Sequence, residues 1–206
     1  MPEAETADTR HRILDAAEEI ARKNGLDSLS MRAIAERIGL SAPAAYRHFR
    51  SKSEIVRAMI ERGYGRFVRG LKAARRGAKG PEEVLAATVR YYLRFWIRDR
   101  TGFQLASEWS RNEVSLTGTA IASGSFGDIP DLVAAILAGS RDPVEIARIG
   151  RWTCATLYGL ALSLVQDEGI PRAREKELVN SAADFLVGAV RTAASGRTEG
   201  ASGKIG

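Results

Sequence analysis

The sequence predicts an all-α protein of about nine helices, with a small N-terminal helical unit and a larger C-terminal helical domain. Apolar residues recur three and four positions apart along most of the chain, which is the period of an amphipathic helix. Ser, Asp and Pro at helix starts and Gly at helix ends divide the chain into segments of helical length. No stretch shows the apolar–polar alternation of a half-buried strand.

The N-terminal part contains four predicted helices with identifiable ends. Gly25 stops the first because glycine adopts the left-handed cap without Cβ strain, and Ser30 can cap the second. Gly39–Ser41 predicts a tight turn, and Ser51–Glu54 is a capping box that opens a long fourth helix. The predicted helices run over Thr6–Asn24, Met31–Ile38, Ala42–Phe49 and from the capping box to about Arg76.

The second part follows Gly77–Gly80, which predicts a break and a domain boundary. Pro81, with two glutamates behind it, starts a fifth helix, and Asp142–Glu145 starts a long eighth one. The predicted segments are helices over 81–98, 101–112, 130–139, 142–167 and 171–194, a long loop over 113–127, and a Gly/Ser-rich disordered tail over 196–206.

Composition excludes several classes of protein. The chain has 206 residues, of which 45% are hydrophobic and 27% charged, so it is neither disordered nor embedded in a membrane. The polar stretch Met1–Arg12 predicts no secretory signal. A single cysteine, Cys154, favours a reducing, cytoplasmic location, and two histidines with one cysteine are too few for a zinc site built from those ligands. We expect no cofactor, no bound metal and no membrane partner.

Positive charge is concentrated in the N-terminal part. Residues 28–79 hold 13 basic residues against three acidic ones, a net charge of +10, whereas residues 81–206 carry a net charge of −1. A local basic surface suits a phosphate backbone or an anionic membrane surface, although a scattered excess is often only a solvated helix face.

The stretch Ser30–Phe49 fits a helix-turn-helix, in which two short helices meet through a tight turn. Gly39 can supply the positive φ of the turn, and Ala45 and Phe49 fall on the inner side of the third helix. The residues left for its outer surface are Ala42, Pro43, Ala44, Tyr46, Arg47 and His48.

The segment Ile13–Gly63, and within it GLSAPAAYRHFRSKSEI, resembles the DNA-binding domain of the TetR-like (tetracycline-repressor-like) transcriptional regulators. The resemblance is strong over about the first quarter of the chain. It implies an all-α homodimer whose N-terminal helices read double-stranded DNA and whose C-terminal domain binds a small effector and dimerises. It also implies that effector binding moves the fourth helix and releases the DNA.

The resemblance assigns roles residue by residue. Tyr46 and Lys52 match phosphate contacts, Arg47 reads guanine or only contacts phosphate, and His48 occupies a phosphate- or base-contacting position. Ala44 departs from the family's usual hydroxyl residue, and Ala45 from a larger aliphatic one. The candidate DNA contacts are Arg32, Ala42, Pro43, Ala44, Tyr46, Arg47, His48 and Lys52.

The C-terminal domain provides two further sets of candidates. Aromatic residues either line an effector cavity or form plain core, and the candidates for ligand contact are Tyr92, Phe95, Trp96, Phe103, Trp109 and Trp152. The eighth helix is apolar on more than one face, so it must bury more than one side. The candidates for a dimer interface are Leu157, Leu160, Leu164, Phe185, Leu186 and Val190.

The sequence therefore predicts a homodimeric repressor that binds a palindromic operator and is released by a small, largely hydrophobic ligand. The expected domains are 1–53 for DNA binding with the helix-turn-helix at 30–49, 54–76 as connecting helix, and 77–195 for effector binding and dimerisation. The alternatives are a small-molecule-binding enzyme and a non-specific architectural DNA-binding protein. An enzyme is disfavoured because the sequence lacks a Gly-rich phosphate loop and a nucleophile–base set, so we expect no catalytic residues.

Overall fold

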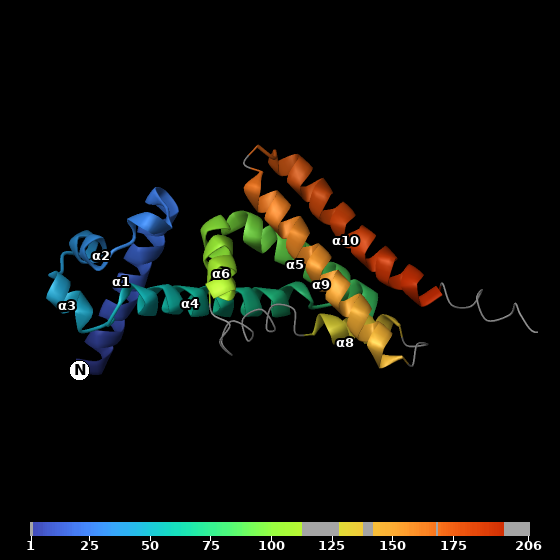
Figure 1. Cartoon of the computed structure of the whole chain (residues 1–206), viewed down its shortest axis with the longest axis horizontal. Helices are drawn as coiled ribbons and strands as arrows, with labels where there is room; N and C mark the ends of the chain where they lie inside the picture. Colours follow the sequence, from blue (N-terminus) through green and yellow to red (C-terminus); the bar gives the residue numbers. More distant parts are fainter. Residues whose placement is uncertain (1, 113–127, 138–141, 168, 196–206) are drawn as a thin grey trace, which may run out of the picture. The chain divides into compact units, whose positions relative to one another are not determined.

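A computed structural model describes residues 2–112, 128–137, 142–167 and 169–195 (Figure 1). Over these ranges it contains nine α-helices, one 3-10 helix and no strand, which confirms the predicted all-α class. The predicted loop over 113–127 and the tail over 196–206 lie outside the described residues. The elements are α1 (Pro2–Asn24), η1 (Leu26–Ser28), α2 (Met31–Ile38), α3 (Ala42–Tyr46), α4 (Lys52–Ala74), α5 (Pro81–Arg98), α6 (Arg100–Asn112), α8 (Ile129–Ile136), α9 (Pro143–Gln166) and α10 (Arg172–Ser195).

The chain divides into two compact units, and the division falls inside α4 between Arg66 and Phe67. Of the described residues, the first unit holds 2–66 with 101–112, and the second holds 67–100, 128–137, 142–167 and 169–195.

Local signals set the ends of the short helices in the first unit. Ser30 accepts a hydrogen bond from the Ala33 N–H at 3.1 Å, and Ser41 accepts one from the Ala44 N–H at 3.3 Å. Gly39 ends α2 at φ 71°, the left-handed region that favours glycine. Helix α3 ends at Tyr46 rather than at the predicted Phe49. The backbone N–H groups of Arg47 and His48 donate to carbonyls only three residues back, which tightens the last turn.

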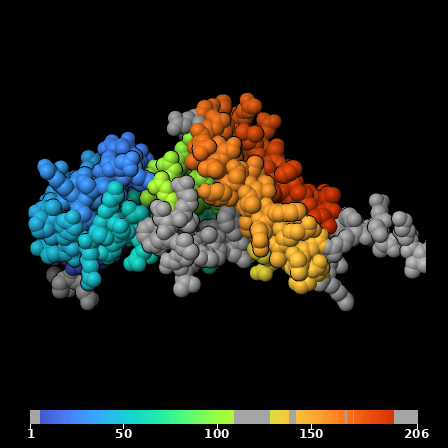
Figure 2. Space-filling view, in the orientation of Figure 1, coloured from blue at the N-terminus to red at the C-terminus, as the bar shows by residue number. Residues whose placement is uncertain are grey.

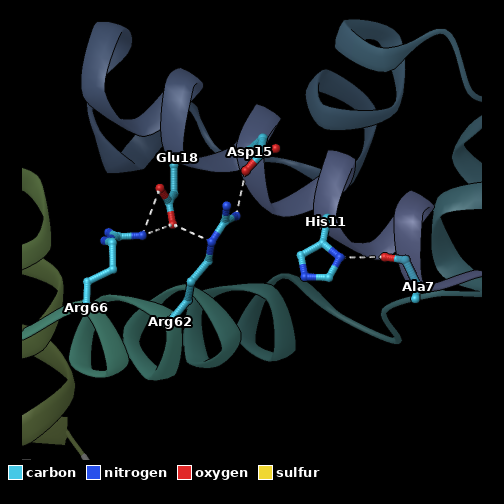
Figure 3. Close-up of polar contacts among 6 residues, drawn as sticks. All are labelled: Ala7, His11, Asp15, Glu18, Arg62 and Arg66. Carbon is cyan, nitrogen blue, oxygen red and sulfur yellow. Dashed lines mark hydrogen bonds and ion pairs between the residues drawn. The ribbon is translucent and has the colours of Figure 1, made fainter. Parts of the chain in front are cut away.

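The core of the first unit consists of apolar side chains from α1 to α4. The fully buried ones are Ile13, Ala17, Ile34, Ala45, Phe49 and Ile55. Ion pairs also tie α1 to α4 (Figure 3). Arg62 lies 2.6 Å from the Asp15 carboxylate, and Arg66 donates to Glu18 at 3.1 Å. The middle of α4 is thereby tied to α1 by ion pairs.

The second unit is built around α5, whose inner face buries Leu85, Val89 and Leu93 completely. The C-terminal half of α5 carries aromatic rings that surround Phe67 of α4, with centroids 5.2–6.0 Å from the Phe67 ring. These rings belong to Tyr91, Tyr92, Phe95 and Trp96. Helices α9 and α10 lie side by side and close the core with Leu157 and Leu186 (Figure 1).

A polar cluster lies within the second unit, just after the end of α4. The Arg75 guanidinium donates from Nε to the Thr88 hydroxyl at 2.9 Å and from both terminal nitrogens to the Asp128 carboxylate. Thr88 is fully buried and donates in turn to the Val84 carbonyl at 2.6 Å. Asp128 is the N-cap residue of α8, so this cluster joins the end of α4 to α5 and to the start of α8.

Candidate nucleic-acid interface

Helix α3 separates an inner side from an outer one, as the sequence predicts. Ala45 and Phe49 are fully buried, whereas the Tyr46 ring is 50% exposed. Of the other predicted contacts on this element, Pro43 and Arg47 are exposed and Ala42, Ala44 and His48 are half-buried. The outer side therefore offers a phenol, a guanidinium and an imidazole from three consecutive residues.

The imidazole of His48 has one buried end. Its Nδ1 is buried and has no hydrogen-bond partner among the described residues. One ring nitrogen of His48 is thus turned away from solvent on the outer side of α3.

The start of α4 forms a shifted version of the predicted capping box, in which the Glu54 carboxylate bonds to the residue before the N-cap. The Glu54 N–H donates to Ser51 Oγ at 3.2 Å, and the Arg50 N–H donates to Glu54 Oε2 at 2.7 Å. Lys52, exposed in the first turn, donates from Nζ to the Leu26 carbonyl at 3.3 Å. A helix N-terminus with a lysine beside it attracts an anion such as a phosphate.

Arg32, the remaining predicted contact, is exposed in the first turn of α2. Its Nε lies 2.7 Å from the Glu36 carboxylate, and this hydrogen-bonded pair raises the pKa of Arg32. The acidic partner reduces the positive potential that Arg32 offers to a phosphate.

The predicted ligand contacts lie in different environments. Tyr92 and Trp96 are buried and Phe95 is half-buried, and all three pack on Phe67. Phe103 is buried in α6, and the Trp109 side chain lies outside what the structure describes. Trp152 on α9, in contrast, is 58% exposed. The Arg148 guanidinium lies over its ring, 4.8 Å from the ring centroid.

Sequence reasoning missed the polar groups near Tyr92. Burial, then the neighbouring Tyr158 and Cys154, raise the pKa of Tyr92. Burial and the charge of Asp128 raise the pKa of Cys154 to about 11. These side chains belong to α5, α9 and the start of α8 and are up to 66 positions apart in the chain, so the sequence holds no local signal that links them.

The predicted dimer contacts divide by burial. Leu157, Leu186 and Val190 are buried within the single chain, Leu160 and Leu164 are half-buried, and Phe185 is 65% exposed. Further exposed apolar residues lie on the outer faces of α9 and α10. Figure 2 shows the face of α9. These are Val144, Trp152, Tyr158, Leu162 and Leu178. A Cβ placed on Gly159 or Gly188 would meet no atom within 4 Å.

None of the helices in the described ranges is long and apolar enough to cross a membrane.

Comparison with known proteins agrees with the geometry of the first unit. Residues 13–59 match the family model described as bacterial regulatory proteins, tetR family. The uncharacterized HTH-type transcriptional regulator Rv1255c of Mycobacterium tuberculosis is 30% identical over 170 residues, which are 82% of this chain and 82% of that protein. The HTH-type transcriptional activator FasR of Mycolicibacterium smegmatis is 33% identical over 99 residues, 48% of this chain and 45% of FasR. This chain thus spans about half the length of some curated relatives that it matches.

The fold is also that of solved regulators. A crystal structure from Saccharomonospora viridis in complex with choline aligns with a TM-score of 0.70 at 16% identity, over 87% of this chain and 96% of that one. At this identity the likeness shows the fold alone. The similarity to Rv1255c, in contrast, extends over most of both chains, and the family model covers the helix-turn-helix. The chain therefore belongs to the tetR family of bacterial regulatory proteins, which bind DNA through a helix-turn-helix and regulate transcription.

Proposed function

We propose that this regulator is a homodimeric repressor that binds a palindromic operator and leaves it when a small, largely hydrophobic ligand binds. The observation that carries the proposal is the outer side of α3, where Tyr46, Arg47 and His48 stand beside the capped, lysine-bearing start of α4. Such a surface combines base-reading donors with phosphate anchors. As a bacterial regulator of transcription it acts in the cytoplasm, where the chromosome is.

We propose functional parts with the limits expected from the sequence, which differ from the two compact units of the fold. Residues 1–53 form the DNA-binding part. Its contacting residues are Arg32, Ala42, Pro43, Ala44, Tyr46, Arg47, His48 and Lys52. Residues 54–76 connect this part to residues 77–195, which bind the ligand and dimerise.

The outer faces of α9 and α10 support dimerisation. A large ring such as Phe185, 65% exposed in one chain, gains stability when a partner covers it. Gly159 and Gly188 leave open space above their helices, which allows a second backbone to approach closely. A two-fold dimer of this kind places two α3 helices on two half-sites, about 34 Å apart if they are one helical turn apart, and so requires a palindromic operator.

The aromatic cluster around Phe67 supports ligand control. Phe67 belongs to α4, the helix that also carries Lys52, so a ligand that moves Tyr92, Phe95 or Trp96 acts directly on α4. Phe103, Trp109 and Trp152 remain candidates for further contacts. The choline in the Saccharomonospora viridis structure supports a small-molecule ligand for this fold. Release requires that the ligand bind the DNA-incompetent arrangement more tightly than the competent one.

The test is selection of duplexes from a random library by the purified full-length protein at moderate salt. We expect an enriched palindrome whose binding persists at a salt concentration that abolishes binding to scrambled duplex. Equal retention of all sequences would support a non-specific architectural protein instead, because non-specific affinity comes almost entirely from counterion release. A thermal-shift screen then identifies ligands, and one that binds tightly without changing operator affinity would contradict ligand control.

A further inference from the structure

Two arginines of α1 reach the C-terminal ends of both helices of the helix-turn-helix. Arg12 donates from Nη2 to the carbonyl of Ile38, the last residue of α2, at 3.0 Å. Arg10 donates from Nη1 to the carbonyl of His48, just after α3. Carbonyls at a helix C-terminus lack partners within the helix and carry partial negative charge, so a guanidinium is a well-matched donor for them.

Arg10 makes two further contacts. Its guanidinium carbon lies 4.0 Å from the centroid of the Phe49 ring, and one nitrogen lies 4.0 Å from the Glu54 carboxylate. Phe49 is fully buried, and Glu54 belongs to the capping box of α4. One side chain thus joins α1 to the end of α3, to the buried ring beneath it and to the start of α4.

These contacts surround the residues that face DNA. Helix α3 has five residues, too few to be stable without outside support. Its exposed side chains can read bases only if the backbone from Tyr46 to Lys52 holds its position to a few tenths of an ångström. The contacts of Arg10 fall on His48, Phe49 and Glu54, within or next to that stretch.

We propose that Arg10 is a positioning residue for sequence recognition, which sets the pose of α3 and of the α4 start from behind, with Arg12 as a second support at α2. The inference rests on the DNA-reading role proposed for α3. It requires the planar fork of a guanidinium, since a lysine ammonium donates from one point and stacks less well on a ring. A direct phosphate contact by Arg10 is the competing explanation, because its side chain is 43% exposed.

The test compares Arg10→Lys and Arg10→Gln with the full-length protein, on the duplex selected from the random library and on a scrambled duplex. Arg10→Lys keeps the charge, so we expect non-specific affinity and the slope of affinity against salt to be unchanged, while specific affinity falls about ten-fold. Arg10→Gln should lose specific affinity at least as strongly. Arg22→Lys and Arg22→Gln, on the exposed side of the same helix, are the matched controls and should leave the ratio of specific to non-specific affinity unchanged.

The outcomes separate the explanations. If Arg10→Lys keeps the full ratio of specific to non-specific affinity, the positioning role is wrong. If Arg10→Gln weakens both duplexes alike and lowers the salt slope by about one, Arg10 is a phosphate contact instead. Measurements well below each variant's unfolding temperature exclude a loss of folded protein as the cause. Failure of the unchanged protein to enrich any sequence would overturn the DNA-reading role of α3 and this inference with it.

Discussion

The hydroxyl of Tyr91 lies against the backbone of α4 at Gly70. A Cβ built on Gly70 would collide with Tyr91 Oη and lie 2.6 Å from its Cζ, so the tyrosine ring would have to shift to admit it. This close approach lets the Tyr91 ring pack on Phe67, with ring centroids 5.4 Å apart. Gly70 therefore serves the packing between α4 and α5, and not a special backbone conformation.

Gly70→Ala should lower the free energy of unfolding by about 1–3 kcal/mol, because the tyrosine must leave its place in the aromatic cluster. Helix propensity alone predicts the opposite sign, a gain of up to about 1 kcal/mol. Gly63→Ala in the same helix is the matched control, since its Cβ would meet only Arg66 Nη2 at 3.7 Å, and it should stabilise. Urea unfolding of both variants checks the pair, and equal stabilisation would contradict the packing argument.

Much of the first unit could be predicted because its signals are local. Ser30, Gly39, Ser41 and the capping box each act within four residues, so the sequence alone places the helix-turn-helix and the side of α3 that faces outward. The 3-10 helix at Leu26–Ser28 was not predicted. Arg10 was missed as well, because its contacts to His48 and Glu54 cross about forty positions of sequence.

In the second unit the spacing of apolar residues predicts which helix faces are buried, but not whether the same chain or a second chain covers them. The apolar stripes of α9 and α10 suit a core as well as a dimer interface, and Leu157 and Leu186 are in fact covered by their own chain, whereas Phe185 is exposed. Phe67 could have been found as the centre of the aromatic cluster only by knowing that α4 packs on α5. The contact of Arg75 with Asp128 joins residues 53 positions apart, and the spacing of apolar residues in the sequence cannot predict it.

The carboxylate of Glu19 should make stability depend on pH below 4.5. Hydrogen bonds from Arg37 and then Lys23 lower the pKa of Glu19 from 4.5 to about 2. The folded state therefore binds this proton less readily than the unfolded state. Its stabilising contribution is complete above pH 4.5 and is lost as the pH falls toward 2.

Glu19→Gln should be less stable than the unchanged protein at pH 7 and equally stable near pH 2. Denaturant unfolding at several pH values between 7 and 2 measures the difference. Glu177→Gln, an exposed carboxylate of α10, controls for the loss of one charge. A difference from the unchanged protein that stays constant over the whole range would show that the hydrogen bonds of Glu19 do not matter.

The thiol of Cys154 should react slowly. Burial and the nearby Asp128 raise its pKa from 9.0 to about 11, so its thiolate fraction at pH 8 is about 100-fold below that of the unfolded chain. A thiol-reactive chromophore should label the folded protein correspondingly slowly and the urea-unfolded protein fast. Asp128→Asn should accelerate labelling of the folded protein. Equal rates in the two states would place the thiol in open solvent.

Phe185→Glu should convert the proposed dimer to a monomer that remains folded, because this ring is exposed in the single chain and a charge there costs nothing until a partner covers it. Leu157→Ala is the counterpart, since Leu157 is fully buried within its own chain. It should lose about 2–5 kcal/mol of stability and still associate. Sedimentation at micromolar concentration together with circular dichroism distinguishes the two effects. An unchanged protein that sediments as a monomer would contradict the proposed interface.

Arg47 and Lys52 should affect DNA binding in different ways. Arg47 is exposed at the end of α3, and its guanidinium suits the O6 and N7 atoms of guanine. Arg47→Ala should therefore weaken binding to the selected operator by about 1–3 kcal/mol and relax the preference at one base pair in each half-site. Lys52 lies at the N-terminus of α4, where the helix dipole and the ammonium both favour a phosphate. Lys52→Ala should weaken all sequences alike and reduce the slope of affinity against salt by about one.

Arg174→Ala on α10 removes the same charge from an exposed position of the second unit and should change neither quantity. Binding measured over a range of salt, on the operator and on single-base variants, separates these cases. A uniform loss on all duplexes for Arg47→Ala would make Arg47 a phosphate contact and leave base reading to its neighbours on α3.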